Sequence, residues 1–204
     1  MRKGINMSTT KKNKHISVDD YLADERYQDI KHEYVNGQAY AMAGASQNHG
    51  RISGNVFRKI GNHLENASCE PFIADMKVKT STGNYRYPDV VITCDNNFID
   101  NGCATKTPVI LVEVLSRSTR KIDEKDKLLE YINIPSLKEY MIIEQDVVDV
   151  TVYRKSDDWR SIHYFMEEDI YFESIDFTLS VEDICHRVEN EDVSDFLKQK
   201  LETT

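Results

Sequence analysis

Residues 108–116 read PVILVEVLS, and residues 87–92 read YPDVVI. Both stretches are runs of mostly apolar, β-branched residues with the length of a buried strand. Each run contains a single carboxylate, Glu113 in the first and Asp89 in the second. Burying an ionised carboxylate is costly, on the order of several kcal/mol, unless a cation, a metal or hydrogen bonds compensate it. These two acids therefore need a partner in the folded protein.

The spacing of the two acids indicates how they meet. They lie 24 residues apart, and the polar loop of residues 95–107 separates the two runs. A loop of this length lets the first strand turn and return beside itself. We therefore expect Asp89 and Glu113 to lie together at one edge of a β-sheet.

Hydrophobic periodicity and turn residues predict the elements around these strands. From residue 47 to about residue 66, apolar residues recur at intervals of four, which predicts a helix whose apolar stripe faces a sheet. Asn36-Gly37 lies between two strand-like runs and predicts a hairpin. We expect further helices over residues 18–22, 123–134, 180–184 and 193–201, and strands over residues 72–79, 140–144, 147–153, 159–165 and 170–179.

The order of these elements predicts the fold class. The strand with Glu113 is followed by a helix and another strand, which indicates one crossover within an otherwise antiparallel sheet. We therefore expect an α/β protein with a mixed β-sheet core, flanking helices and additional antiparallel strands. With 204 residues, of which 40% are hydrophobic, the chain suits one domain over residues 17–190. A disordered basic tail over residues 1–16 and a C-terminal helix or tail over residues 191–204 complete the expected organisation.

The acidic composition limits the class of partner. The chain has 26 Lys and Arg against 35 Asp and Glu, so its formal net charge is −9. This charge argues against a protein that coats nucleic acid through an overall positive field. Local contact remains compatible with it if negative charge gathers at a metal site and basic residues line the approach. The basic residues of the N-terminal tail are either solvated or make such a contact to DNA.

The sequence also carries signals about compartment. No apolar run approaches the roughly 18 residues of a membrane span, and the N-terminus has no apolar region of the signal-peptide type. The cysteines have no CxxC spacing, so we expect reduced thiols in a cytoplasmic protein rather than a zinc site, and no membrane partner. These cysteines are Cys69, Cys94, Cys103 and Cys185.

Two carboxylates and a lysine form the set that metal-dependent phosphodiester cleavage uses. Mg²⁺ prefers oxygen ligands and takes one or two carboxylates plus waters, which leaves positions for a phosphate. The cation also activates water and offsets the charge that develops on the phosphate. Asp89 and Glu113 are therefore our candidate catalytic residues and Mg²⁺ ligands, with Mn²⁺ as the alternative metal.

The usual Glu-x-Lys pattern fails here, because Leu115 occupies the position of the lysine. However, Lys121, Lys125 and Lys127 lie in and just before the helix that follows. A lysine side chain reaches about 6 Å from its backbone, so a lysine of another element can supply the missing ammonium. We expect Lys127 to do so, because it lies at the edge of the apolar stripe, with Lys125 in second place. The alternative for Lys121 and Lys125 is a solvated charge.

His49 lies near the beginning of the helix over residues 47–66 and is a second-tier candidate, as a hydrogen-bonding group of the site. Each candidate also has a structural alternative. These alternatives are a turn residue after proline for Asp89, an ion pair with Arg86 or Lys127 for Glu113 and a structural role for His49. We expect Tyr131 in the core rather than in catalysis.

Several sequence blocks occur together in order: RYPDV at residues 86–90, VEVLSRST at 112–119, KLLEY at 127–131 and EY at 139–140. With EYVNG at residues 33–37 and His49, they resemble the Uma-two family of restriction endonucleases, which belongs to the PD-(D/E)xK nuclease superfamily. The similarity covers roughly residues 18–181. The joint occurrence of the blocks is far more specific than any one of them.

The resemblance implies a restriction-endonuclease-like core with Asp89 and Glu113 as metal ligands and the lysine displaced onto the helix at Lys127. It also implies Glu33 as an accessory acid at the metal, the carbonyl of Val114 as a third candidate ligand, a DNA substrate and a homodimer. We therefore expect a Mg²⁺-dependent DNA endonuclease. The alternatives are a catalytically inactive DNA-binding or accessory protein on the same fold, and a metal-dependent hydrolase of another substrate.

Overall fold

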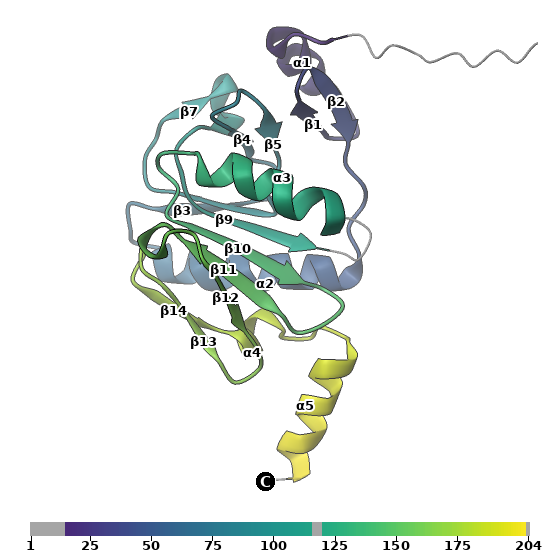
Figure 1. The fold of residues 1–204 in the computed structure, drawn as a ribbon, viewed down its shortest axis with the longest axis vertical. Helices are drawn as coiled ribbons and strands as arrows, with labels where there is room; N and C mark the ends of the chain where they lie inside the picture. Colours follow the sequence, from purple (N-terminus) through teal and green to yellow (C-terminus); the bar gives the residue numbers. More distant parts are fainter. Residues whose placement is uncertain (1–14, 116–119, 203–204) are drawn as a thin grey trace, which may run out of the picture. The chain divides into compact units, whose positions relative to one another are not determined.

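The computed structural model describes residues 15–115 and 120–202 (Figure 1). The chain divides into two units, one ending at Met42 and the other beginning at Ala43. Residues 1–14 of the predicted basic tail lie outside the described residues. Within the described residues, no helix has both the length and the apolar character that a membrane span requires.

The N-terminal unit contains a short helix and a hairpin. Helix α1 (Val18–Glu25) begins after Ser17, whose side chain accepts a hydrogen bond from the backbone N–H of Asp20 at 3.1 Å. Strands β1 (His32–Val35) and β2 (Gln38–Ala41) pair antiparallel around Asn36-Gly37. Both turn residues have positive φ, 50° and 82°, as a two-residue hairpin turn requires. The predicted hairpin and the predicted helix start are therefore confirmed.

The C-terminal unit is built on a six-stranded sheet in the order β12-β11-β10-β9-β6-β3. Only β9 and β10 pair in parallel, and α3 (Arg120–Ile132) connects them, so the predicted crossover in an otherwise antiparallel sheet is confirmed. The strands are β3 (Glu70–Ile73), β6 (Val90–Thr93), β9 (Pro108–Leu115), β10 (Glu139–Glu144), β11 (Val150–Arg154) and β12 (Ser161–Tyr164).

Helices cover this sheet on both faces, with α2 (Gln47–Leu64) on one and α3 on the other (Figure 1). Successive side chains of a strand point to opposite faces, so β9 supplies residues to two separate apolar clusters. Its Ile110, Val112 and Val114 pack in the cluster that holds the buried stripe of α2. Its Leu111 and Leu115 pack in the cluster that holds Tyr131 of α3. Glu113 alternates with these leucines and therefore points to the α3 side.

Smaller elements complete the C-terminal unit. Strand β4 pairs with β5 and β8, and β8 pairs with β7. Strands β13 and β14 form a separate hairpin. The bounds are β4 (Lys77–Lys79), β5 (Tyr85–Arg86), β7 (Phe98–Ile99), β8 (Ala104–Thr105), β13 (Asp169–Phe172), β14 (Phe177–Ser180), α4 (Val181–Ile184) and α5 (Glu191–Glu202), with 3₁₀ turns at Asp100–Gly102 and Lys155–Asp157.

Three predicted segments are wrong in detail. The strand expected over residues 72–79 is broken at Ala74, whose φ of 59° turns the chain, and its halves join different sheets. The loop expected over residues 95–107 contains the short strands β7 and β8. The single strand expected over residues 170–179 is the β13–β14 hairpin, which turns at Asp176 with a φ of 49°.

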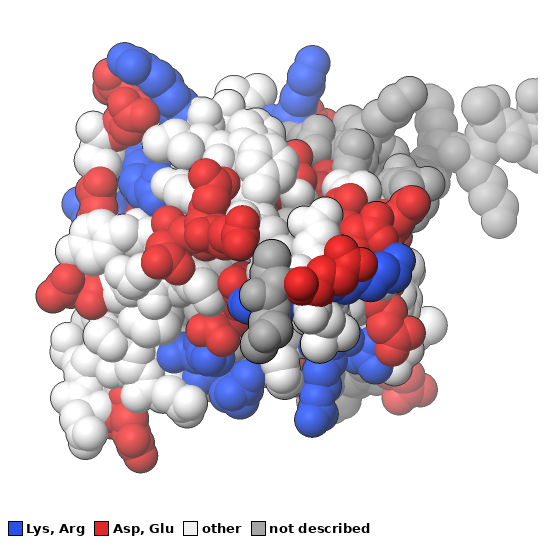
Figure 2. Space-filling view, turned by 90° about the horizontal axis from the view of Figure 1, so that it is seen from below, with Lys and Arg blue, Asp and Glu red and all other residues white. Residues whose placement is uncertain are grey.

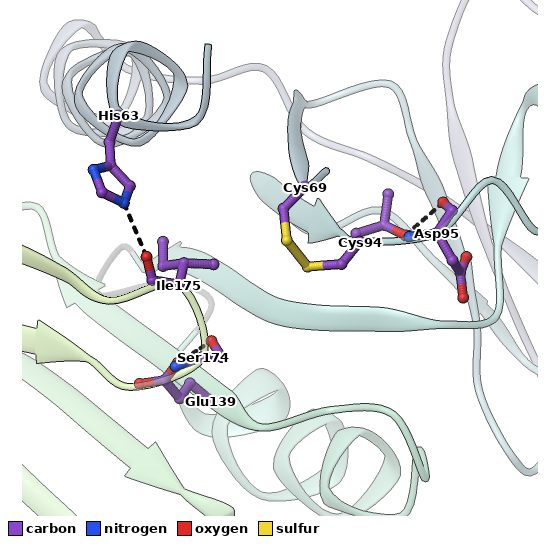
Figure 3. The surroundings of a disulfide bond; sticks show 8 residues. His63, Cys69, Cys94, Asp95, Glu139, Ser174 and Ile175 are labelled. Carbon is purple, nitrogen blue, oxygen red and sulfur yellow. Dashed lines mark hydrogen bonds between the residues drawn. A yellow bond between two sulfur atoms is a disulfide. The ribbon is translucent and has the colours of Figure 1, made fainter. Parts of the chain in front are cut away.

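The expectation of reduced thiols is wrong for two of the four cysteines. Cys69 and Cys94 form a disulfide directly beyond the paired ends of β3 and β6 (Figure 3). The register of these strands places Glu70 opposite Thr93, so the next residues outward face each other. Cys103 and Cys185 are free thiols, the first exposed and the second buried. The pairing depends on the strand register, which the spacing of the cysteines does not reveal.

Candidate active site

Asp89 and Glu113 come together at one end of the six-stranded sheet. Asp89 directly precedes β6, and Glu113 lies two residues before the end of β9. These strands are antiparallel, with Val90 opposite Val112. Oδ2 of Asp89 accepts a hydrogen bond from the backbone N–H of Val114 at 2.7 Å. The carboxylate of Asp89 is therefore anchored to the residue that follows Glu113.

The carboxylate of Glu113 is held by two side chains of α3. The ammonium of Lys127 lies 3.2 Å from Oε1 of Glu113, and the hydroxyl of Tyr131 donates to the same oxygen at 2.8 Å. All three side chains are buried. Because Lys127 and Tyr131 are four residues apart, they project from the same side of α3 toward the sheet. A buried carboxylate thus receives both a cation and a neutral donor.

His49 reaches the site from α2, on the other side of the sheet. Ser46 caps this helix by accepting from the backbone N–H of His49 at 3.1 Å, which fixes the first turn. Nε2 of His49 lies 3.1 Å from Oδ1 of Asp89, so the imidazole donates to the carboxylate. Burial lowers the pKa of His49, but the hydrogen bond and charge of Asp89 and the charge of Glu113 outweigh it, so the pKa is raised. Both carboxylates therefore favour the positively charged form of the His49 imidazole.

The donor set suits a hard cation. Among the described residues, no three His, Cys, Asp or Glu side chains are arranged to hold a metal ion. Two carboxylates on neighbouring strands do fit Mg²⁺, which takes one or two carboxylates and keeps several waters. In the described part of the chain, no cysteine and only one histidine, His49, lie at these carboxylates, which favours an oxygen-bound cation over zinc.

The remaining candidate residues are Lys125, Lys121 and Glu33. Lys125 is exposed on α3, and within the described part of the chain it forms no ion pair with Asp89 or Glu113. The side chain of Lys121 lies outside the described residues. Glu33 lies on β1 of the N-terminal unit, and its assignment as a metal ligand stays a prediction. Leu115, at the usual lysine position, is buried in the apolar cluster below α3.

Tyr131 was predicted only as a core residue, yet its hydroxyl contacts Glu113. Its ring is fully buried and packs edge to face against Tyr140, so the core prediction is also right. Its spacing of four residues from Lys127 was the signal for the second role. A neighbouring ion pair also joins α3 to a strand. Arg86 of β5 binds Glu130 of α3 through two nitrogens, at 3.0 and 2.8 Å. This pair fixes α3 over the strand that leads to Asp89.

Comparison with known proteins places the chain in a family. The model of the Uma2 family, described as "Putative restriction endonuclease", matches residues 18–182. Two uncharacterized proteins of Synechocystis sp. are similar in sequence. Protein slr1290 is 36% identical over 175 residues, which are 84% of this chain and 92% of that protein. Protein sll1609 is 33% identical over 146 residues, which are 70% of this chain and 82% of that protein.

A solved structure shares the fold. The crystal structure of a "putative nuclease belonging to DUF820" from Anabaena variabilis superposes with a TM-score of 0.68 at 16% sequence identity. The match covers 83% of this chain and 97% of that chain. The predicted restriction-endonuclease-like α/β fold class is confirmed. Because the family model spans most of the sequence and two relatives match over most of their length, the chain belongs to the Uma2 family.

Proposed function

We propose that this protein is a Mg²⁺-dependent DNA endonuclease that hydrolyses phosphodiester bonds, with Mn²⁺ as an alternative cofactor. The observation that carries the proposal is the convergence of three side chains. Lys127 contacts Glu113, and Asp89 is hydrogen-bonded to the residue next to Glu113. The Uma2 family description supports DNA as the substrate.

The carboxylates of Asp89 and Glu113 would hold the cation, and we assign Glu33 to it as an accessory acid. When bound, the cation activates a water molecule as the nucleophile and offsets the negative charge that develops on the phosphate. The carboxylates gain a fixed direction from the protein, because the N–H of Val114 holds Oδ2 of Asp89 and Tyr131 holds Oε1 of Glu113. Preformed geometry of this kind lowers the cost of orienting groups during the reaction.

Lys127 supplies the positive charge of the site. Its ammonium lies 3.2 Å from Oε1 of Glu113 and brings a positive charge to the two carboxylates. The same positive charge can stabilise the charge that develops on a phosphate oxygen next to Glu113. His49 is a positioning residue, because its Nε2 proton holds Oδ1 of Asp89. The raised pKa of His49 keeps its imidazole positively charged to a higher pH than that of an ordinary histidine.

The test is cleavage of supercoiled plasmid DNA with Mg²⁺, with Mn²⁺ and with EDTA. We expect nicking with either metal and none with EDTA. Asp89→Asn and Lys127→Met are expected to lower the rate at least 100-fold. Lys198→Met is the matched control, because Lys198 is an exposed lysine of α5 that pairs with the exposed Asp195, and its loss should not change the rate.

The outcomes separate the endonuclease from the accessory protein. An unmodified chain that cleaves no DNA under any metal contradicts the endonuclease proposal. DNA binding without cleavage would then favour the accessory role on the same fold.

The homodimer stays a prediction from the family resemblance. Nucleases of this superfamily that cut both strands generally use one active site for each strand, which requires two copies. Light scattering should then give a mass near twice the 23.6 kDa of one chain. A mass of one chain with and without DNA would count against the dimer.

A further inference from the structure

The outer surface of α2 carries an open pocket that the proposed active site does not use. Its volume is about 480 Å³, and it lies between α2 and the turn that follows α4. Its lining includes three arginines, two glycines and an asparagine: Arg51, Arg58, Arg187, Gly50, Gly54 and Asn55. The pocket is therefore strongly basic in a chain whose formal net charge is −9.

The arginine charges are available to a ligand. Arg58 and Arg187 are exposed, and neither forms an ion pair within the part of the chain that the structure describes. Arg51 lies 2.9 Å from Glu189, but the side chain of Glu189 is 75% exposed. Such a surface pair is weak and readily exchanged. On the face drawn in Figure 2, Lys and Arg form several separate groups, in the lower part, at the upper left and at the top of the view, with Asp and Glu between them.

The two glycines leave the helix surface open. Glycine weakens a helix interior relative to alanine, so each glycine in α2 needs a reason. Internal packing is not that reason, because a Cβ at Gly50 or Gly54 would meet nothing within 4 Å. Bare helix backbone beside arginines lets a bulky polar ligand approach closely.

The turn that carries Arg187 is held in a fixed position. The side-chain amide of Asn55 donates to the carbonyls of Ile184 and His186 at 3.0 and 2.8 Å. The side chain of Asn48 exchanges two hydrogen bonds with the backbone of Glu189, at 2.8 and 3.0 Å. Two asparagines of α2 therefore hydrogen-bond to the backbone of the turn on both sides of Arg187. These bonds fix the backbone position from which the arginine side chain extends.

The spacing of the arginines suits a polyanion rather than a single phosphate. Arg51 and Arg58 are seven residues apart, which corresponds to about 10 Å along a helix axis. A DNA duplex carries one phosphate charge for about every 1.7 Å of its axis, so several phosphates fall within this length. The pocket also adjoins the proposed active site along the chain, because Gly50 directly follows His49, whose imidazole contacts Asp89.

We propose that this pocket binds the sugar–phosphate backbone of the DNA substrate and positions the duplex for cleavage at Asp89 and Glu113. The inference rests on the proposed endonuclease function. Arg58 and Arg187 contact phosphates directly, and Gly50 and Gly54 provide the room for the backbone. The contact is independent of base sequence, as phosphate contacts are.

Binding of a fluorescein-labelled 20-base-pair duplex to the full chain in EDTA tests the pocket without any cleavage. The double variant Arg58→Ala/Arg187→Ala should weaken binding at least 10-fold at 0.1 M salt. Because each lost phosphate contact lowers the slope of log K against log salt by about 0.9, the slope should fall by about 1.8. The control Arg160→Ala/Lys198→Ala removes the same charge from exposed sites elsewhere and should leave the slope unchanged.

A second pair of variants does not remove any arginine. Gly54→Glu fills the pocket with a negative side chain and should weaken binding as much as the double variant. Gly54→Ala adds only a Cβ, which meets no other group of the protein, and should weaken binding less than Gly54→Glu does. Thermal melts of all variants show whether each one is folded.

Each outcome bears on one of the two proposals. Equal slopes of log K against log salt for Arg58→Ala/Arg187→Ala and for its control overturn the pocket proposal. Tighter binding of an RNA duplex of the same sequence than of the DNA duplex also overturns it. A chain that binds DNA through the pocket but never cleaves it supports this inference and contradicts the endonuclease. If the unmodified protein cleaves DNA and the variant Arg58→Ala/Arg187→Ala still binds DNA normally, the endonuclease proposal is supported and the pocket proposal is contradicted.

Discussion

The ammonium of Lys127, on α3, lies 3.2 Å from Oε1 of Glu113, on β9, and both side chains are more than nine-tenths buried. The pair joins the helix and the strand that the crossover connects. A buried ion pair of this kind is strongly coupled, because removing one partner leaves an uncompensated charge in the interior. The same pair therefore contributes to both folding and the proposed chemistry, and the two contributions can be separated.

Lys127→Met keeps the length of the side chain and removes its charge. We expect the free energy of unfolding to fall by about 3 kcal/mol, because the buried Glu113 loses its cation. Glu113→Gln/Lys127→Met removes both charges and should recover most of that stability. Neither variant should cleave DNA. Urea unfolding and plasmid nicking on the same samples measure both effects. Cleavage by the double variant would contradict the roles assigned to this pair.

Tyr131→Phe removes one hydroxyl and leaves the buried ring in place against Tyr140. The lost hydrogen bond ends on a carboxylate, and bonds to charged groups contribute about 1.5–3 kcal/mol. We therefore expect a loss of stability of about 2 kcal/mol. Since Lys127 still holds Glu113, the cleavage rate should fall by less than 10-fold. A rate as low as that of Lys127→Met would show that the hydroxyl acts in the reaction itself.

The sequence predicts the parts of this fold that depend on local pattern. The buried residues of α2 follow the interval of four, and the parallel pairing of β9 and β10 follows from the strand–helix–strand order. The placement of Lys127 beside Glu113 was predicted from its position at the edge of an apolar stripe. In each case a short stretch of sequence carries the whole signal.

Other features depend on contacts that no short stretch contains. Ala74 breaks a strand because its backbone adopts a left-handed conformation, which alanine does not favour by itself. The contact of Tyr131 with Glu113 requires the helix to sit over the strand in one rotation. Such features depend on tertiary packing, and local propensity does not predict them.

The charge state of His49 makes the stability of the metal-free protein depend on pH. Its pKa is raised above the ordinary value of 6.5 in the folded protein. The folded state therefore holds the proton more tightly than the unfolded chain, which stabilises the fold below about pH 6.5. This contribution disappears as the pH rises through the raised pKa.

His49→Gln isolates this contribution. The difference in free energy of unfolding between the unmodified protein and His49→Gln should be largest near pH 5.5 and should shrink toward pH 8.5. Urea unfolding in EDTA across this range measures the difference. Titrating groups that do not interact with His49 contribute equally to both proteins and cancel. A difference that is constant with pH would contradict the ion pair between His49 and Asp89.

The disulfide between Cys69 and Cys94 closes a loop with a sequence separation of 25 residues. A cross-link over a loop of this length restricts the unfolded chain and stabilises the fold by about 3 kcal/mol. We therefore expect Cys69→Ser/Cys94→Ser, or reduction with dithiothreitol, to lower the free energy of unfolding by about this amount. The double variant should not respond to dithiothreitol, and Cys103→Ser, which removes an exposed free thiol, should behave as the unmodified protein.

Because β6 begins directly after Asp89 and ends directly before Cys94, loss of the disulfide should also weaken Mg²⁺-dependent cleavage at elevated temperature. Urea unfolding with and without reductant decides the first point, and equal midpoints would show that the cross-link does not stabilise the protein in solution.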